Sequence, residues 1–251
     1  MRKKENLNEN ILHLFESINL TYLQDKALLL NRKDLKFIFS KTVLNSVLED
    51  CLQDYQILKI NNACLFQYKS NYLDTKGLDL YFDHHRGKGN RYKIREREYI
   101  QGQLRYIELK YKTNKNQTIK VREPVSNSTD IKRFISQNTG FSETDLYTSL
   151  NVEYTRITLL NKTNKEKVTL DLNIKCYHKD PNVISYDNIV IAEVKSERMI
   201  ALKFNEIMKK HKIRSGSLSK YCLGLISLNP KLKQNNFKMM LNQIIKVNNN
   251  G

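Results

Sequence analysis

Basic residues recur two positions apart in three successive segments, and this spacing constrains the fold more than any other feature of the chain. The segments are residues 91–97 (Arg-Tyr-Lys-Ile-Arg-Glu-Arg), 108–112 (Glu-Leu-Lys-Tyr-Lys) and 120–122 (Lys-Val-Arg). In a β-strand, residues two apart point to the same face of the sheet. Three successive strands of this kind direct their cations to one side. The spacing therefore predicts a sheet with a concave, anion-binding face.

The charge of the chain indicates a polyanionic partner. The formal net charge is +17, and the stretch from Arg86 to Arg122 holds twelve Lys and Arg residues against three Glu. Two unit charges about 4 Å apart repel by roughly 4 kcal/mol at an effective dielectric constant of 20, so a bound anion would relieve the cluster. Nucleic acid, a nucleotide, polyphosphate and an acidic membrane surface are the candidate partners.

The middle of the chain is predicted to form short strands joined by tight turns, which is typical of an antiparallel barrel or a strongly curved sheet. The strands are expected at residues 35–39, 56–60, 64–73, 77–83, 90–99, 104–112, 117–122, 152–160, 167–175 and 188–195. Apolar periodicity predicts helices at residues 5–18, 41–54 (with Ser40 as N-cap), 197–211 (with Ser196 as N-cap) and 237–247. Residues 128–150 are expected to be helical or irregular and to lie outside the sheet.

No stretch of the sequence approaches the roughly 18 apolar residues of a membrane helix, and the first residues lack the apolar core of a signal peptide. The four cysteines are scattered without Cys-x-x-Cys spacing and are expected to be reduced and buried. These features predict a cytoplasmic protein.

Two glutamates stand out as candidate metal ligands. Glu193 interrupts an otherwise apolar strand, where burial makes a carboxylate costly, and Glu108 shares a strand face with Lys110. Each could instead form a cross-strand ion pair with a lysine. In a phosphate-binding channel, however, a carboxylate can hold Mg²⁺ or Mn²⁺ against phosphate oxygens. The adjacent His84 and His85 are placed on a strand and are therefore not expected to bind one metal together.

The order of motifs resembles the bacterial VTC domain of polyphosphate polymerases. These enzymes belong to the triphosphate tunnel metalloenzymes, together with the CYTH-type triphosphatases. The resemblance covers about residues 30 to 225 and rests on segments 36–37 (Lys-Phe), 72–74 (Tyr-Leu-Asp), 84–88 (His-His-Arg-Gly-Lys), 91–99, 108–112, 120–122, 154–156 (Tyr-Thr-Arg), 168–171 (Val-Thr-Leu-Asp), 192–195 (Ala-Glu-Val-Lys) and 218–221 (Leu-Ser-Lys-Tyr).

The resemblance implies an α+β fold in which a closed, antiparallel eight-stranded β-barrel forms the triphosphate tunnel, with flanking helices. It divides the chain into an N-terminal helical extension (1–30), the tunnel domain (31–228) and a C-terminal helix and tail (229–251). Taken with the spacing argument, it predicts a phosphate-binding set of Lys36, Arg91, Lys93, Arg95, Arg97, Lys110, Lys112, Lys120, Arg122, Arg156, Lys167 and Lys220. Of these, Lys36, Arg156 and Lys220 follow from the resemblance alone, and Lys167 stands where the family tends to place arginine.

The catalytic residues expected within this set are Arg95, Arg97, Lys110 and Lys220. Glu193 takes the family's metal-binding place, with Glu108 as a second ligand, and the implied cofactor is Mn²⁺ or Mg²⁺. The superfamily favours an early Glu-x-Glu-x-Lys motif. Here only Asp34 keeps a carboxylate before Lys36, which leaves more of the metal binding to Glu193.

The implied activity is transfer of the γ-phosphoryl group of ATP to a growing polyphosphate chain. The expected ligands are ATP, polyphosphate and pyrophosphate, and any membrane association would be made through a separate membrane protein. One alternative is hydrolysis of triphosphates in the same tunnel. A different class is a non-catalytic module that binds polyphosphate or nucleic acid, in which Tyr92, Tyr99, Tyr106 and Tyr111 would stack on bases. Nucleic acid is the less favoured partner, and the sequence does not decide the oligomeric state.

Overall fold

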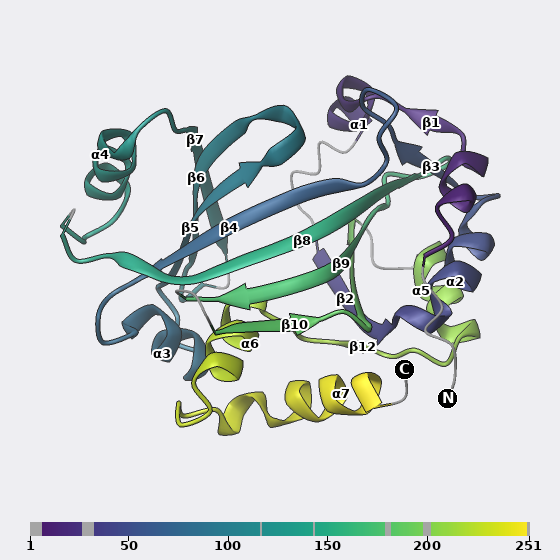
Figure 1. The fold of residues 1–251 in the computed structure, drawn as a ribbon. Helices are drawn as coiled ribbons and strands as arrows, with labels where there is room; N and C mark the ends of the chain where they lie inside the picture. Colours follow the sequence, from purple (N-terminus) through teal and green to yellow (C-terminus); the bar gives the residue numbers. More distant parts are fainter. Residues whose placement is uncertain are drawn as a thin grey trace.

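A strongly curved sheet organises the protein (Figure 1). The computed structural model describes residues 7–26, 33–115, 117–142, 144–178, 182–197 and 202–249. The main path of the sheet has the order β12-β2-β11-β9-β8-β4-β5-β6-β7, with β1, β3 and β10 added beside it. The strands are β1 (Ser17–Ile18), β2 (Lys33–Ser40), β3 (Tyr55–Leu58), β4 (Phe66–Asp74), β5 (Arg91–Tyr99), β6 (Leu104–Lys112), β7 (Thr118–Pro124), β8 (Tyr147–Asn161), β9 (Lys167–Tyr177), β10 (Val183–Tyr186), β11 (Ile189–Ser196) and β12 (Ser215–Gly216).

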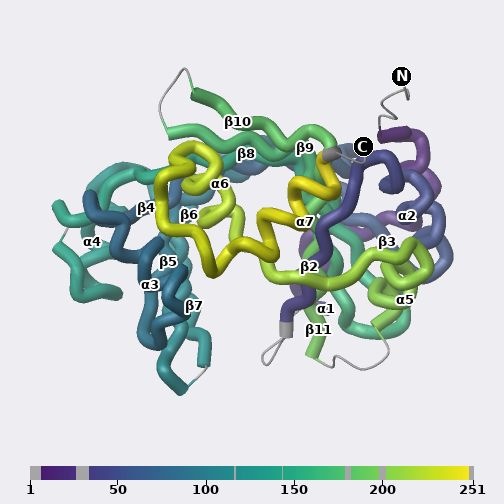
Figure 2. Tube along the Cα trace, turned by 90° about the horizontal axis from the view of Figure 1, so that it is seen from below, coloured from purple at the N-terminus to yellow at the C-terminus, as the bar shows by residue number. Residues whose placement is uncertain are grey.

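The sheet forms an arch rather than the closed eight-stranded barrel that the resemblance implies. Seen from below, β5, β6 and β7 form one limb, β2 and β11 form the other, and β8 and β9 span the top (Figure 2). The path ends at β7 and β12, and no pairing between these two strands joins the limbs within the described residues. Register shifts in the β4–β8 and β8–β9 ladders bend the long central strands, as β-bulges do. The prediction of a strongly curved antiparallel sheet was therefore right. The predictions that this sheet closes into a barrel and that it has eight strands were wrong.

Helices cover the outside of the arch and fill one end of its hollow. They are α1 (Leu20–Lys26), α2 (Leu44–Cys51), α3 (Asp79–His85), α4 (Ser128–Asn138), α5 (Lys203–Lys210), α6 (Lys220–Leu228) and α7 (Lys238–Asn249), with short 3₁₀ turns at Glu9–Leu14, Lys41–Val43, Ile100–Gly102 and Asn235–Phe237. The α2 and α5 helices pack in one apolar core with the outward side chains of β2, among them Phe37 and Phe39. The α6 helix packs in a second core with inward side chains such as Tyr154 and Ile191.

Several predicted elements are wrong. Within the helix expected at residues 5–18, the described residues form a 3₁₀ turn (Glu9–Leu14) and the β1 strand, and residues 147–150, expected outside the sheet, belong to β8. At two further places a carboxylate outside the element explains the difference. Residues 77–83 were expected to form a strand, but α3 begins at Asp79, where the buried Asp74 carboxylate accepts hydrogen bonds from the amides of Leu80 and Tyr81. The two histidines therefore lie on a helix. The helix predicted from Glu197 begins only at Lys203, and Ser196 belongs to β11. Residues 198–201 lie outside the described residues.

Other elements agree with their predictions. The strands over β5 to β7 match closely, and the Ser40 hydroxyl accepts a hydrogen bond from the Thr42 amide at the start of the expected helix. The four cysteines are free and buried. The short β10 strand and the α6 helix were not predicted. Among the described helices, none is both long enough and apolar enough to cross a membrane.

Replacing Glu166 with alanine is expected to lower the free energy of unfolding by more than about 2 kcal/mol. This fully buried side chain accepts hydrogen bonds from the Tyr55 hydroxyl (2.5 Å) and from the amides of Lys203 (3.0 Å) and Phe204 (2.9 Å). Each buried donor left without a partner costs about 1–3 kcal/mol. Urea unfolding followed by circular dichroism measures the change. Tyr55→Phe removes one hydroxyl and should cost only about 1 kcal/mol, and an equal cost for both variants would contradict this account.

Candidate functional site

A cavity of about 1720 Å³ fills the hollow of the arch, and cationic side chains cover much of its wall. All but one of the predicted phosphate-binding residues line it, namely Lys36, Arg91, Lys93, Arg95, Arg97, Lys110, Lys112, Lys120, Arg122, Arg156 and Lys167. The predicted metal ligands Glu193 and Glu108 line it as well. Lys220 is the exception, since it is not among the lining residues. The alternating spacing in the sequence thus brings its cations to one concave face.

The register of β5, β6 and β7 aligns these cations in rows across the wall. Lys93 pairs with Lys110, which pairs with Lys120 on the third strand. In the next row inward-facing Arg95 lies opposite Glu108, which lies opposite Arg122. Directly opposed side chains on antiparallel strands have Cβ atoms only about 4.5–5.5 Å apart. A chain of phosphates lying along the wall would meet a new row of cations every two residues.

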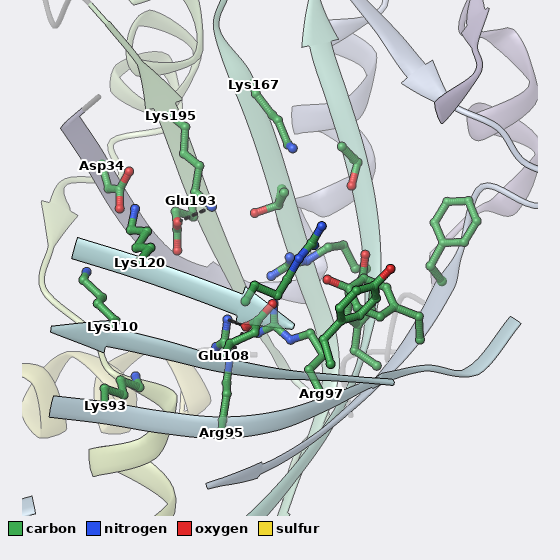
Figure 3. Close-up of a pocket in the computed structure, with 18 of the residues that line it drawn as sticks. Asp34, Lys93, Arg95, Arg97, Glu108, Lys110, Lys120, Lys167, Glu193 and Lys195 are labelled. Atoms are coloured by element: carbon green, nitrogen blue, oxygen red, sulfur yellow. Dashed lines mark hydrogen bonds and ion pairs between the residues drawn. The ribbon is translucent and has the colours of Figure 1, made fainter. Parts of the chain in front are cut away.

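The facing wall combines lysines with two carboxylates (Figure 3). The side chain of Glu193 on β11 forms ion pairs with Lys195 (2.9 Å) and with Lys36 on β2 (3.8 Å). Burial opposes ionisation of Glu193, but the two ammonium groups outweigh it and hold the pKa of this carboxyl well below its usual range. Asp34 lies on β2 in register with Lys195, and Lys167 lies opposite Lys195 on β9. Glu193 is therefore an anion throughout the physiological pH range.

Glu108 is engaged by two arginines. Its Oε2 atom accepts a hydrogen bond from Arg95 Nε (2.6 Å) and lies 3.5 Å from Arg97 Nη1. Burial raises the pKa of this carboxyl, but Arg95 and Arg97 outweigh burial and lower it overall. Arg95 also donates to the Tyr72 hydroxyl and Arg97 to the Ser70 hydroxyl. These contacts orient both guanidinium groups, so that Glu108 acts as their counter-ion in this structure; its role as a metal ligand stays a prediction.

Lys220 and Arg156 share a buried carboxylate behind the cavity wall. The Asp171 side chain, 1% exposed, accepts hydrogen bonds from Arg156 Nε (2.6 Å) and Nη2 (2.8 Å) and from Lys220 Nζ. Burial opposes ionisation of Asp171, yet the two cations lower its pKa to about 2. Asp171 thereby fixes the position of the Arg156 guanidinium at the cavity. Lys220, at the start of α6, donates to the same carboxylate and does not itself line the cavity. A direct role of Lys220 on phosphate stays a prediction.

Tyr72 is a buried member of the site that the sequence analysis missed. Its ring lies beneath Lys93 Nζ at 5.1 Å, and Lys93 also donates to the Ser219 hydroxyl (3.2 Å). Burial raises the pKa of the Tyr72 phenol, but Lys93, Arg95, Arg97 and Lys220 outweigh it and bring the pKa to about 8. Burial lowers the pKa of Lys93. Only the tertiary structure reveals this contact, because Lys93 and Ser219 are far apart in the chain.

His84 and Lys195 are two further cavity residues outside the predicted set. Burial, together with Lys93, Arg91 and other nearby cations, lowers the pKa of His84 to about 3, so its imidazole is neutral and its Nδ1 accepts a hydrogen bond from Arg91 Nε. His85 instead packs against Tyr81 and Phe237. Lys195 could have been included from sequence, because it is two residues from Glu193 in the same strand.

The wall carrying Glu193 and Asp34 fits a divalent cation that takes its remaining ligands from phosphate and water. The buried Oδ1 atom of Asp34 has no hydrogen-bond partner within the described residues. No group of three or more His, Cys, Asp or Glu side chains suited to a metal occurs in that same part of the chain. Mg²⁺ usually binds through one or two carboxylates together with substrate phosphates, which matches this donor set.

Raising the pH from 7 to 9 is expected to weaken the binding of tripolyphosphate about tenfold. Burial and the ammonium groups of Lys120 and Lys93 lower the pKa of Lys110 to about 8, so this cation loses its proton in that interval and its attraction for the anion disappears. Calorimetric titration across the pH range measures the affinity. Lys110→Arg stays protonated and should flatten the profile. The Tyr72 phenol also has a pKa of about 8, and Tyr72→Phe, which removes it, should keep the pH dependence of tripolyphosphate affinity. If the affinity of Lys110→Arg falls with pH as steeply as that of wild type, Lys110 is not the group responsible.

One family model matches this sequence. It is that of the VTC domain, and the match spans residues 31–229. No curated protein matches the chain.

Solved structures with a similar fold have low sequence identity. HpAC1 from Hippeastrum, described as having a dominant triphosphatase activity, is 12% identical with a TM-score of 0.50, and the alignment covers 80% of this chain and 96% of that one. A "putative adenylate cyclase" from Bacillus halodurans is 13% identical with a TM-score of 0.48, covering 76% and 96% of the two chains. At such identities the likeness concerns the fold.

Proposed function

The chain belongs to the VTC domain family, and on this premise we propose that it is a metal-dependent ATP:polyphosphate phosphotransferase of the triphosphate tunnel type. The observation that carries the proposal is the pairing of cationic rows on β5, β6 and β7 with a carboxylate-bearing wall on β2 and β11. Phosphoryl transfer depends chiefly on positioning and on neutralising charge, which such a cavity supplies.

The triphosphate of ATP would lie along the cationic rows. Arg95 and Arg97, oriented by Glu108, present guanidinium groups that suit bidentate contacts with phosphate oxygens. Arg156, held by Asp171, offers a third fixed guanidinium. Lys110 and Lys120 add compact charges in the adjoining row. All of these groups stabilise negative charge that spreads over the equatorial oxygens in the transition state.

Glu193 and Asp34 would hold Mn²⁺ or Mg²⁺, which when bound neutralises phosphate charge and orients the transferring group. During transfer, the bond between the γ-phosphorus and its bridging oxygen breaks, and ADP leaves with the electron pair. A terminal phosphate oxygen of the polyphosphate chain forms the new bond. Because the cavity is larger than most small-molecule pockets, it has room for both donor and acceptor.

Hydrolysis of the triphosphate is the second candidate, because the same volume also admits water as the acceptor. A nucleic-acid module is less favoured. Tyr92 and Tyr111, two of its expected stacking platforms, pack against each other with ring centroids 4.6 Å apart, and Phe141 packs against Tyr92.

Incubation of the purified protein with ATP and Mn²⁺ or Mg²⁺ tests the proposal. Products are resolved on a polyacrylamide gel stained for polyphosphate, while ADP and free phosphate are assayed in parallel. A ladder of polymer with ADP is the expected result. Free phosphate without polymer would identify a triphosphatase. Binding of tripolyphosphate without consumption of ATP would identify a non-catalytic sensor and overturn the proposed reaction.

A further inference from the structure

Two cavity-lining residues each carry a buried polar atom that has no hydrogen-bond partner within the described residues. These atoms are Oδ1 of Asp34 and Oγ1 of Thr169. A buried hydroxyl without a partner is costly, so such groups are rare in folded proteins and each needs a physical explanation. Asp34 belongs to the wall that fits a divalent cation, whereas nothing in the fold accounts for the Thr169 hydroxyl.

The register of the sheet places Thr169 directly beside Glu193. Thr169 on β9 is the cross-strand partner of Glu193 on β11, and Lys36 on β2 is the partner of Glu193 on the other side. Directly opposed residues of antiparallel strands have Cβ atoms only about 4.5–5.5 Å apart, so a threonine hydroxyl can reach a glutamate carboxylate across this gap. The Thr169 side chain is 2% exposed, which shields this hydroxyl from bulk water.

In this structure the Glu193 carboxylate is directed at lysines. Its Oε1 atom lies 2.9 Å from Lys195 Nζ, and its Oε2 atom lies 3.8 Å from Lys36 Nζ (Figure 3). A bound oligophosphate attracts these ammonium groups to its own oxygens, so a Glu193 carboxylate that binds metal would lose its present partners. A carboxylate that ligates a metal is normally oriented by a hydrogen bond from a neighbouring group. Thr169 carries the unused donor next to it.

Building on the proposed function, we propose that Thr169 is a positioning residue for Glu193. Its hydroxyl donates a hydrogen bond to the Glu193 carboxylate when that carboxylate turns from its lysines to a divalent cation. Rotation of the two side chains is sufficient, and the register between β9 and β11 is kept. The hydroxyl contacts neither the phosphates nor the reacting atoms. The metal-free protein is accordingly less stable than it could be, as is common where a site is prepared for function.

Thr169→Val removes the hydroxyl and keeps the shape of the side chain, and it should weaken Mn²⁺ binding about tenfold. The electron paramagnetic resonance signal of free Mn²⁺ measures this affinity, with tripolyphosphate kept below the protein concentration so that little remains to chelate the metal in solution. Without metal, tripolyphosphate affinity should stay within about twofold of wild type, because the hydroxyl does not contact the anion. The thermal unfolding midpoint of the metal-free variant should rise by about 2–4 °C, since an unpartnered buried hydroxyl has been removed.

Two further variants serve as controls. Thr169→Ser keeps the hydroxyl and should bind Mn²⁺ within about threefold of wild type. Thr155→Val makes the same substitution at a half-buried residue of β8 that does not line the cavity, and it should change neither affinity. Unchanged Mn²⁺ affinity in Thr169→Val, or equally weakened affinity in Thr169→Ser with a lowered unfolding midpoint in both, would overturn the role of Thr169 and leave the proposed function intact. Wild-type protein that binds Mn²⁺ no more tightly than Glu193→Gln would overturn the metal site of the proposed function as well.

Discussion

Replacing Glu193 with glutamine is expected to lower the turnover of ATP more than about a hundredfold, the scale on which a preorganised charge-stabilising group acts. The Glu193 carboxylate is ionised because Lys195 and Lys36 offset the cost of its burial. A carboxylate is a far better ligand than an amide for Mg²⁺ or Mn²⁺. Glutamine keeps the size of the side chain, so the loss would reflect charge. Steady-state rates at saturating ATP and a series of metal concentrations measure it.

The controls for Glu193→Gln separate metal binding from folding. In the absence of metal, tripolyphosphate should bind the variant at least as tightly as wild type, because one negative charge has left a cationic cavity. Glu153→Gln is the matched control. Glu153 lies on β8 outside the cavity lining, where its carboxylate pairs with Lys69 and accepts a hydrogen bond from Tyr177. This variant should retain wild-type turnover. Near-native turnover in Glu193→Gln, at unchanged metal dependence, would exclude Glu193 as a metal ligand.

Replacing Arg95 with alanine is the second change expected to cost more than about a hundredfold in turnover. Arg95 contacts Glu108 and Tyr72, which hold its guanidinium group at the cavity wall. The substitution removes a fixed cation where charge develops on the transferring phosphoryl group. Rates of ADP release and of polymer formation measure the effect, with the thermal unfolding midpoint as a check on folding.

Arg95→Lys distinguishes charge from geometry. Lysine restores the positive charge but not the planar fork, so we expect it to recover only part of the lost turnover. Arg105→Ala is the matched control, because Arg105 is exposed and pairs with Glu96 away from the cavity. A fully active Arg95→Lys variant would show that charge alone suffices. A fully active Arg95→Ala variant would remove Arg95 from the catalytic set.

Much of the sheet could be predicted because strand periodicity is local. The positions of β5, β6 and β7 follow from alternation at a period of two and from the turn residues between them. The α3 helix could not be found in this way. The amides of Leu80 and Tyr81 are satisfied by Asp74, six and seven residues earlier at the end of the preceding strand, and a count of alternating residues does not register such a capping contact. The start of α5 depends in the same way on Glu166, which lies 37 residues before Lys203.

The role of each site residue could be predicted only in part. The spacing indicated which cations face the cavity, and the apolar surroundings of Glu193 singled out that carboxylate. Nothing local in the sequence indicated that Glu108 pairs with Arg95 and Arg97, or that Asp171 joins Arg156 to Lys220. These pairings are set by strand register and by the docking of α6.

The sequence by itself therefore determined that a β-sheet presents rows of cations on one face, since the direction of a strand side chain depends only on its parity. Only the tertiary structure decided that the sheet is an open arch, that its cationic wall faces Glu193 and Asp34, and that Asp171 joins Arg156 to Lys220. These features depend on bulges, on the register between distant strands and on helix packing. They join residues far apart in the chain, where periodicity carries no information.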